Sequence, residues 1–520
     1  MHTIDRCFRL LKVSSRRRVI IILGIIGGLF LALNYVASNH EFTNKRFLPE
    51  NKNQDKTILI SHPRRYDFVT ELTTPTITTN SEIGIISTIT HYEDDRVNES
   101  SYKEMDKIIN EYEPFRDQFV GFESVNSEIN KNQNIFKNEM FSFSCETKSL
   151  RRAQKRNKNL VVYENFVIST LSMELECHQS ITYTTHGDYR YLDNLIPLVD
   201  RWAGPVSIAI YSPGDDLKRT LKIISFLRDC NFQKIKQFVT FHLFFDVLYS
   251  ESPVYGEQFQ WLDSMYQKER WENCSIKPDP VKLRNENTFR MKHGLLYPVN
   301  VARNIARAAA LTHFVLPSDI ELYPSINLIR TFFEMHYEEN KNNEKPVIMP
   351  ARQVFVLPIF EIEKGVMPPQ TKSELVHLLQ IGEAIPFHYK ICKECHLIPK
   401  FIEWNQMPLH PEKLQVFHTA KRKPPFQFWE PIYIGTKYDP QYDTRLSYEG
   451  LRDKMTQGYI LCALDYKFLI LDNAFLIHRP GVKKSMHEIT KTVVRQDRLI
   501  NLKIKVELFK RFGKQEGCTL

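Results

Sequence analysis

The sequence predicts an α/β fold in which a mostly parallel, twisted sheet is flanked by helices. From about Val161 onward, short apolar runs alternate with longer segments of helical periodicity. Such alternation is typical of parallel strands joined by crossover helices. No GxGxxG motif and no Walker loop follows any of these strand-like runs, which argues against dinucleotide-binding and P-loop folds.

The expected elements follow one another in strand and helix order. A strand over 181–184 precedes a helix over 191–202, and a strand over 206–211 ends in Ser212-Pro-Gly-Asp215. The next expected elements are a helix over 217–228, a strand over 238–248, a helix over 300–311, a strand over 312–316, a helix over 326–337 and a strand over 468–477. In open α/β sheets, ligands bind beyond the carboxyl ends of the strands, so polar residues at those ends are the first candidates for a site.

Composition and charge narrow the class of protein. The 520 residues are 42% apolar and 25% charged, with 18 Gly and 27 Pro, which excludes a collagen, a wholly disordered chain and a protein with many membrane spans. The formal charge of +9 suits nucleic acid, anionic lipid or an acidic substrate. No motif combines stacking aromatic residues with basic ones, so no nucleic-acid partner is expected.

The uncharged apolar run over 19–37 has about the ~20 residues that a membrane-spanning helix needs. A basic cluster, Arg16-Arg17-Arg18, precedes it. The positive-inside rule therefore predicts a cytoplasmic tail (1–18), a single-pass type II signal-anchor (19–37) and a lumenal remainder. A cleaved signal peptide is the alternative, but the run is long and lacks a clear cleavage site.

The lumenal part divides into an irregular segment and a folded domain. Residues 38–160 are polar and without a sustained period, which predicts a stem. Its end carries the basic run 148–158, a solvated surface or a polyanion-binding segment. The folded domain is expected over 161–515.

Cysteine usage agrees with the secretory pathway. Nine cysteines are present and only Cys7 precedes the apolar run, so disulfides are expected among the others. Cys392-Lys-Glu-Cys395 has the spacing of half a zinc site, but no second such pair completes it. N-glycosylation acceptor patterns begin at Asn98 and Asn273.

An acidic pair follows the expected strand over 312–316. Asp319 and Glu321 are separated by one residue, so they lie on one side of an extended chain. Their hard oxygens suit Mg²⁺ or Mn²⁺, which neutralise a diphosphate. His478, at the end of the expected strand over 468–477, is a candidate third ligand. The alternatives are a solvated acidic turn and a structural histidine.

Residues 181–484 resemble glycosyltransferase family 49, which includes β-1,4-glucuronyltransferase and the second catalytic domain of the LARGE proteins. The resemblance rests on six blocks in the same order: YPVNVARN (297–304), SDIELYPS (318–325), VFVLPIFEI (354–362), WEPIY (429–433), YDTR (442–445) and LDNAFLIH (471–478). It implies a GT-A-like catalytic domain, an inverting transfer, a UDP-sugar donor and Mn²⁺ or Mg²⁺. The anchor and stem match a type II Golgi enzyme.

The resemblance also assigns roles to individual residues. Asp319 and Glu321 match the DxD positions of the family, where many relatives have Asp instead of Glu321, and His478 matches a late metal-binding histidine. Residues expected to hold the nucleotide are Asn300, Arg303 and Asn304, together with Thr184, Thr185 and His186 of the first core strand. The alternative for the first three is one basic face of an amphipathic helix.

Two carboxylates are candidates for the base that deprotonates the acceptor hydroxyl. They are Glu449, slightly favoured, and Asp453; the alternative role is that of carboxylates at a helix N-terminus. Trp429 and Tyr433 are candidates for stacking on sugar rings, with core packing as the alternative.

The donor predicted by the resemblance is UDP-glucuronate, with a xylose-like glycan terminus on a glycoprotein as acceptor. The glucuronate carboxylate needs a cation, and Arg352, Lys390 and Arg445 are available. Alternatives are UDP-N-acetylglucosamine or another UDP-sugar, and a catalytically silent relative that binds glycans or chaperones a transferase. Assembly as a homo-oligomer or with other glycosyltransferases is compatible with each.

Overall fold

The structure, a computed structural model, describes residues 150–156, 159–230, 232–253, 258–340, 352–408, 413–482 and 490–520. All of them belong to the second of two compact units, Glu93–Leu520. Outside the described residues lie the expected tail, the expected span over 19–37, the stem up to residue 149 and the glycosylation acceptor at Asn98. Within those ranges, no helix is both long and apolar enough to cross a membrane.

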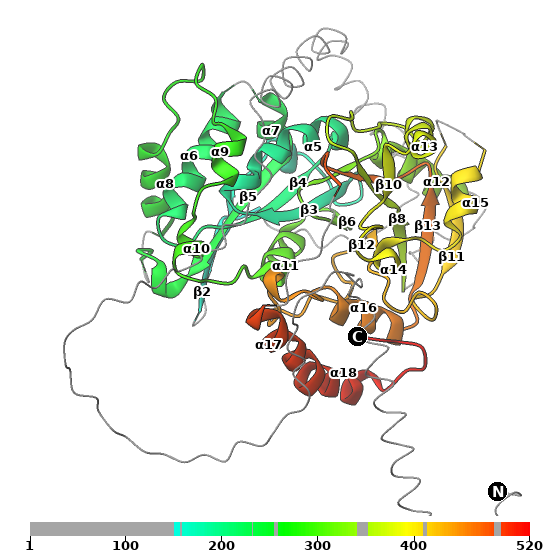
Figure 1. The fold of residues 1–520 in the computed structure, drawn as a ribbon. Coiled ribbons are helices and arrows are strands. Elements are labelled where there is room, and N and C mark those ends of the chain that lie inside the picture. Colours follow the sequence, from blue (N-terminus) through cyan, green and yellow to red (C-terminus); the bar gives the residue numbers. More distant parts are fainter. Residues whose placement is uncertain are drawn as a thin grey trace, which may run out of the picture. The chain divides into compact units, whose positions relative to one another are not determined.

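The centre of the fold is a ten-stranded mixed sheet in which most strands run in one direction, as predicted. Strands β5, β4, β3 and β6 are parallel neighbours, and β8 and β13 form a second parallel pair. In spatial order the strands are β1 (Ala153–Arg156), β2 (Leu160–Val167), β5 (Val239–Asp246), β4 (Val206–Tyr211), β3 (Ile181–Gly187), β6 (Phe314–Pro317), β12 (Ile432–Thr436), β8 (Gln353–Leu357), β13 (Lys467–Asp472) and β11 (Gln415–Ala420) (Figure 1). Strand β1 lies in the range assigned to the stem and pairs with β2.

Helices cover both faces of this sheet because its strands are apolar on both sides. Along β4, Ile208 and Ile210 join the core under α5, α6, α7 and α8, whereas Ala209 and Tyr211 pack against α11 (Figure 1). Alanines 302 and 306 face the sheet, so α11 lies close to it. The helices of this half are η2 (Leu171–Met173), η3 (Tyr189–Asn194), α5 (Leu195–Trp202), α6 (Asp216–Asp229), α7 (Gln233–Phe238), η4 (Val247–Tyr249), α8 (Gln258–Lys268), α9 (Pro280–Arg284), α10 (Phe289–Lys292) and α11 (Val299–Ala309).

The second half of the domain adds further helices around β8, β12 and β13. They are α12 (Leu328–Asn340), α13 (Lys372–Ile381), α14 (Lys393–His396), α15 (Phe401–Gln406), η5 (Tyr448–Gly450), α16 (Met455–Ala463), α17 (Lys491–Leu499), η6 (Ile500–Ile504) and α18 (Lys505–Phe512). The helices expected over 217–228, 300–311 and 326–337 are confirmed as α6, α11 and α12. The segment expected as one helix over 191–202 begins as the 3₁₀ helix η3.

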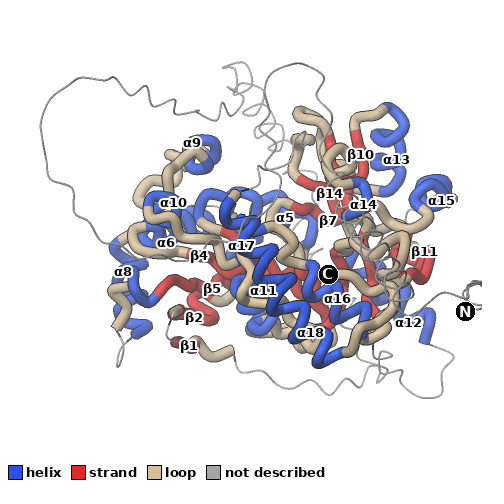
Figure 2. Tube along the Cα trace, turned by 60° about the horizontal axis from the view of Figure 1, so that its bottom comes forward, coloured by secondary structure: helices blue, strands red, loops and turns tan. Residues whose placement is uncertain are grey.

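A smaller four-stranded sheet brings together two of the predicted metal ligands, Glu321 just before β7 and His478 at the end of β14. Its strands, in spatial order, are β10 (Ala384–Pro386), β9 (Ile359–Ile362), β14 (Leu476–His478) and β7 (Leu322–Pro324). Strands β7 and β14 are antiparallel, and His478 lies opposite Leu322. Figure 2 shows β7, β14 and β10 together. The strand after the acidic pair is therefore bonded to the strand that ends in His478.

The prediction of one continuous strand over 468–477 is wrong. The chain leaves the large sheet after Asp472, and Asn473 adopts a left-handed conformation with φ of 62°; the chain then enters the small sheet as β14. Asn is among the few residues that tolerate this conformation. Asp472 is anchored by a buried ion pair with Lys372 of α13, whose Nζ lies 2.5 Å from Asp472 Oδ1. An Asp-Asn pair inside the apolar run was the available signal.

Disulfides, expected from the cysteine content, are confirmed. Pairs in which both cysteines belong to the described residues are Cys230–Cys274, Cys392–Cys395 and Cys462–Cys518. The Cys392-Lys-Glu-Cys395 segment thus closes on itself as a disulfide, and the pair Cys462–Cys518 fastens the C-terminal residues to α16.

Histidine 336 on α12 is expected to make folding stability depend on pH. Burial, with the nearby charge of His313, lowers the pKa of His336 to about 4, against about 6.5 in an unfolded chain. Between these values the unfolded chain binds a proton that the folded chain excludes, so stability falls as the pH drops from 6.5 to 4. The expected loss is about 3 kcal/mol from this residue alone.

Urea unfolding at pH 7 and pH 4 measures that loss. The His336→Phe variant keeps a ring beside Phe332 and Phe314 and has nothing to titrate. Its free energy of unfolding should fall by about 3 kcal/mol less than that of the parent over this interval. Equal losses in the two proteins would contradict the assignment.

Candidate functional site

The acidic turn that follows β6 is held by the neighbouring strand β3. The backbone N–H of Ser318 donates to the carbonyl of Thr184 at 3.0 Å. The buried hydroxyl of Tyr183 lies 2.8 Å from the carbonyl oxygen of Asp319 and 2.7 Å from that of Leu322. Because β3 belongs to the rigid centre of the sheet, Asp319 is presented at the carboxyl edge of the parallel strands, as predicted.

The side chain of Asp319 lies among three nitrogen-bearing groups. Arg303 Nη2 is 3.2 Å and His186 Nε2 is 3.4 Å from Asp319 Oδ1, and Lys454 Nζ is 3.3 Å from Asp319 Oδ2. Burial alone would raise the pKa of Asp319, but Lys454, His186 and Arg303 outweigh it and hold the pKa well below the usual 3.8. Asp319 is therefore ionised at any physiological pH.

The predicted nucleotide-binding residues of α11 hold a loop to the helix. Arg303 Nη1 pairs with Asp453 and donates to Asn300 Oδ1 at 3.0 Å. Asn300 Nδ2 donates to the carbonyl of Asp453 at 2.9 Å, and Asn304 exchanges hydrogen bonds with the backbone of Tyr442 at 2.8 and 3.1 Å. Residues 442–453 are thereby fixed beside Asp319.

The predicted residues of β3, Thr184, Thr185 and His186, lie near the carboxyl end of that strand, beside the end of β6. His186 Nδ1 is 3.1 Å from the hydroxyl of Tyr297, and burial lowers the pKa of His186 despite the nearby Asp319. The hydroxyls of Thr184 and Thr185 are buried and have no hydrogen-bond partner among the described residues. Such groups are unusual in folded proteins and often face a ligand or water.

His478 is oriented as a neutral ligand. Its Nδ1 lies 2.8 Å from the carbonyl oxygen of Arg479, and because a carbonyl only accepts, Nδ1 carries the proton and Nε2 keeps its lone pair. Burial lowers the pKa of His478, opposed by the charge of Glu321. Glu321 itself faces Arg479, with 3.5 Å between Oε1 and Nη1.

The donor types of this trio fit a divalent cation. Two carboxylates and an imidazole with an available lone pair suit Mn²⁺ or Mg²⁺. Asp319 and Glu321 are ion-paired with cationic side chains here, and across the described residues no three His, Cys, Asp or Glu side chains are gathered closely enough to hold an ion. The chemistry of the residues therefore fits the ion, whereas their present pairing is with Arg303, Lys454 and Arg479.

Both predicted base candidates have their carboxylates engaged. Glu449 Oε1 accepts from Arg290 Nη1 at 2.5 Å and its Oε2 accepts from the backbone N–H of Tyr297 at 2.9 Å. Asp453 pairs with the buried Arg303. These contacts fasten the 442–453 loop to the residues before α11 and to α11 itself.

The residues predicted to contact sugars are buried, paired with other side chains or distant from Asp319. Trp429 and Tyr433 are 1% and 4% exposed, so no ring face is available for stacking and the packing alternative describes them. Arg445 pairs with Asp443 and with Glu507 at the surface. Arg352 precedes β8, which runs in the same direction as β6, so it lies at the edge of the sheet opposite Asp319, and this position does not favour a contact with the donor sugar.

Two charged residues of the site were missed from the sequence. Lys454 directly follows Asp453, and Glu430 lies inside the WEPIY block. Both were within the motifs already identified, but an isolated Lys or Glu carries no periodic signal of burial. The proximity of these charged residues to the site becomes visible only once α11, β6 and the 442–454 segment are packed together.

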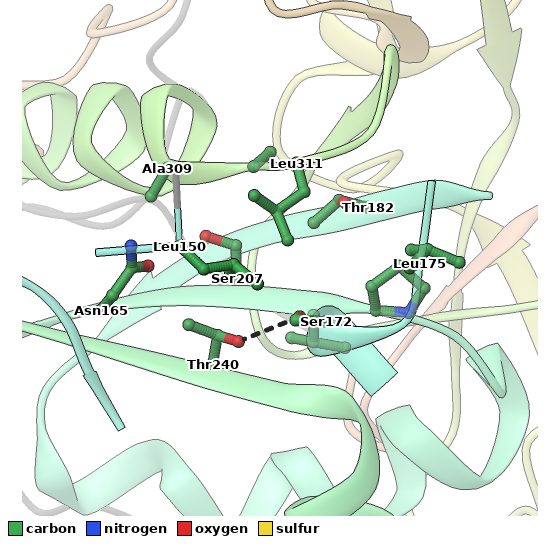
Figure 3. Close-up of a pocket in the computed structure, with 12 residues that line it drawn as sticks. Leu150, Asn165, Ser172, Leu175, Thr182, Ser207, Thr240, Ala309 and Leu311 are labelled. Atoms are coloured by element: carbon green, nitrogen blue, oxygen red, sulfur yellow. Dashed lines mark hydrogen bonds between the residues drawn. The ribbon is translucent and has the colours of Figure 1, made fainter. Parts of the chain in front are cut away.

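A small cavity lies at the other edge of the sheet, where β3, β4 and β5 begin. Thr182, Ser207 and Thr240 line it together with the end of α11 (Figure 3). Its volume of about 10 Å³ is enough for roughly one water molecule. It is too small for a sugar or nucleotide and is separate from Asp319.

Comparison with known proteins identifies relatives of this chain. A family model described as "Glycosyl-transferase for dystroglycan" matches residues 180–513. A zebrafish (Danio rerio) protein named beta-1,4-glucuronyltransferase 1 is 30% identical over 331 residues, which is 61% of this chain and 72% of that protein. The human (Homo sapiens) protein of the same name is 25% identical over 309 residues, 59% of this chain and 69% of its own.

A more limited match involves a second kind of relative. The chicken (Gallus gallus) xylosyl- and glucuronyltransferase LARGE2s is 28% identical over 191 residues, which is 36% of this chain and 23% of that protein. The matched residues of this chain in the family comparison include β3, α11, the acidic turn and β14.

Removing Arg303 is expected to destabilise the protein much more than removing Arg445. The guanidinium of Arg303 is 6% exposed and serves both Asp319 and Asp453, whereas Arg445 is 38% exposed. Arg303→Met leaves Asp453 without its ion-pair partner and leaves Asp319 with only Lys454 and His186, which costs about 3–5 kcal/mol. Arg445→Met breaks solvated pairs worth about 0–1 kcal/mol.

Urea unfolding of both variants at pH 7 tests this difference, with Arg445→Met as the matched control. The contribution of Asp319 persists above the usual carboxyl pKa of 3.8 and disappears as the pH falls below it, because its folded pKa is depressed. The difference should therefore remain at pH 5. Similar losses for the two variants would show that Arg303 is not the centre of the charge cluster.

Proposed function

We infer the function from the family: this chain belongs to glycosyltransferase family 49 and is a glycosyltransferase that uses a nucleotide-sugar donor and a glycan acceptor. We propose that the donor is UDP-glucuronate and the acceptor a xylose-like terminus on a glycoprotein. The names of the zebrafish, human and chicken relatives support glucuronate as the transferred sugar. The observation that carries the proposal is the ionised Asp319 beside Arg303 and Lys454, with His478 on the adjoining strand.

The diphosphate of the donor would bind at the carboxyl edge of β3 and β6. Lys454 and Arg303 place two positive charges there, and the unpartnered hydroxyls of Thr184 and Thr185 are close in sequence to His186. Asp319, Glu321 and His478 would hold a Mn²⁺ or Mg²⁺ ion. That ion, when bound, supplies positive charge against the developing charge of the leaving diphosphate.

The reaction is an inverting displacement on a GT-A-like domain. The acceptor hydroxyl attacks the anomeric carbon from the side opposite the diphosphate, and a carboxylate takes the hydroxyl proton. The bond between the anomeric carbon and the phosphate oxygen breaks, and its electron pair leaves with UDP. Lys454 and Arg303 stabilise the negative charge of the leaving UDP. Because their ion pairs already hold them in place without the donor, they need no rearrangement during the reaction.

The carboxylate of glucuronate requires a further cation near the sugar. Lys390 pairs with Glu363 at the surface, and Arg445 and Arg352 are engaged or distant. Arg479 lies next to His478 and pairs with Glu321 at 3.5 Å. It is the better candidate, because binding of a cation by Glu321 would free its guanidinium for the sugar carboxylate.

The cellular setting that fits is a type II Golgi membrane protein with residues 19–37 as its anchor. Three disulfides in the described domain suit an oxidising compartment. A lumenal position would also place Asn273, which lies in the described part, within reach of glycosylation.

A donor screen tests the function. The full-length chain is incubated with each UDP-sugar in turn, a xyloside acceptor and either Mn²⁺ or a chelator, and UDP release and product are measured. We expect glucuronate to be fastest, the chelator to abolish transfer, and Asp319→Ala to lower kcat/KM by at least about 100-fold.

Asp200→Ala is the control for that substitution, because Asp200 is a half-exposed residue of α5 paired with Lys234; its activity should equal that of the parent. Preference for UDP-N-acetylglucosamine or another donor would overturn the glucuronate assignment. Absence of turnover with every donor would favour a silent glycan-binding or chaperone relative.

A further inference from the structure

Glu430 differs from every other carboxylate of the site. Asp319, Glu321, Asp453 and Glu449 each have an ion-pair partner. The carboxylate of Glu430 has no hydrogen bond and no ion pair within the part of the chain that the structure describes. The residue is intermediate between buried and exposed. Glu430 is therefore a carboxylate whose oxygens are available to a ligand.

The fold places Glu430 at the edge of the sheet where Asp319 lies. It comes just before β12, which is antiparallel to β6 with Gly435 opposite Val315. Continuing that register toward the start of β12 leads to the end of β6, where Asp319 begins the acidic turn. Glu430, just before β12, and Asp319, just after β6, thus lie at the same edge of two adjacent strands.

The backbone around Glu430 is held from two sides. Its N–H donates to the carbonyl of Cys395 at 2.7 Å, in the short segment closed by the disulfide with Cys392. The carbonyl of the preceding Trp429 accepts from the buried Arg422 Nε at 2.7 Å. Trp429 itself is buried against Phe468. The backbone from which the Glu430 side chain extends is consequently held in place by fixed groups.

The charges around Glu430 are those of the reaction centre. Burial raises the pKa of Glu430, and Asp453 adds to this, while Lys454, Arg422 and Arg303 oppose it. His396 of α14 also faces this region and is kept neutral because burial and the charge of Lys454 hold its pKa well below 6.5. A carboxyl group with a raised pKa accepts a proton more readily than one held ionised by an arginine.

We propose that Glu430 is the general base of the transfer reaction. This rests on the proposed function. An oxygen of Glu430 takes the proton of the acceptor hydroxyl while that hydroxyl oxygen bonds to the anomeric carbon, and the bond to the phosphate oxygen breaks with its electrons going to UDP. Glu449 and Asp453 are positioning residues, because their carboxylates fasten the 442–453 loop to Arg290, Tyr297 and Arg303.

The test compares Glu430→Gln with Glu449→Gln and Glu430→Asp in the full-length chain, using UDP-glucuronate, Mn²⁺ and a xyloside acceptor. Glutamine keeps the shape of Glu430 and removes the proton acceptor. We expect kcat to fall by about 10²–10⁴-fold in Glu430→Gln, with KM for the donor and calorimetric affinity for UDP with Mn²⁺ within about twofold of the parent. Glu430→Asp should recover part of kcat and shift its acidic limb.

Glu449→Gln breaks a structural contact, so the free energy of unfolding should fall. Any loss of activity should be spread over kcat and KM, and the acidic limb of the pH profile of kcat should be unchanged. A parent that transfers glucuronate while Glu430→Gln retains its kcat would overturn the role of Glu430 and leave the proposed function intact. A Glu430→Gln chain that loses UDP affinity together with kcat would also overturn it, since a base does not hold the nucleotide. A parent that releases no UDP from any donor would overturn the proposed function and the role of Glu430 together.

Discussion

The ion pairs of Asp319 are the constraint on which the site depends. A carboxylate with limited access to water is costly to keep charged, and Arg303, Lys454 and His186 offset that cost from three different segments. Each of those segments must therefore arrive at the same edge of the sheet. Helix α11 supplies Arg303, and the loop it holds supplies Asp453 and, next in sequence, Lys454. The packing of α11 on β3 and β4 thus determines the electrostatics of the candidate site.

A second constraint is the transfer of the chain from the large sheet to the small one. If the segment after β13 continued straight, His478 would remain in the large sheet and far from Leu322. The left-handed Asn473 and the buried pair of Asp472 with Lys372 end β13 and send the chain into β14. Pairing of β14 with β7 then sets the imidazole beside the acidic turn. Backbone geometry at one residue therefore governs whether the trio can share a ligand.

Much of the fold and the core of the site was predictable from residues alone. An apolar run such as 206–211, closed by a turn sequence, predicts a strand. An acidic pair directly after a strand is predicted to lie at the carboxyl edge of a parallel sheet. Contacts between distant segments were not predictable, because they depend on packing. The aromatic character of Trp429 and Tyr433 does not reveal whether they contact a sugar or pack in the core. The charge of Arg352 likewise does not reveal at which edge of the sheet it lies. Glu430 and Lys454 acquire meaning only from the charges that the fold brings around them.

The disulfide between Cys392 and Cys395 has a consequence for biosynthesis. A ring of so few residues restricts the unfolded chain little, so the bond contributes chiefly to the shape of the turn whose carbonyl receives the Glu430 N–H. A polypeptide made in a reducing compartment lacks this local brace. Oxidative maturation is in this way linked to the alignment of a single side chain, and heterologous production benefits from an oxidising host.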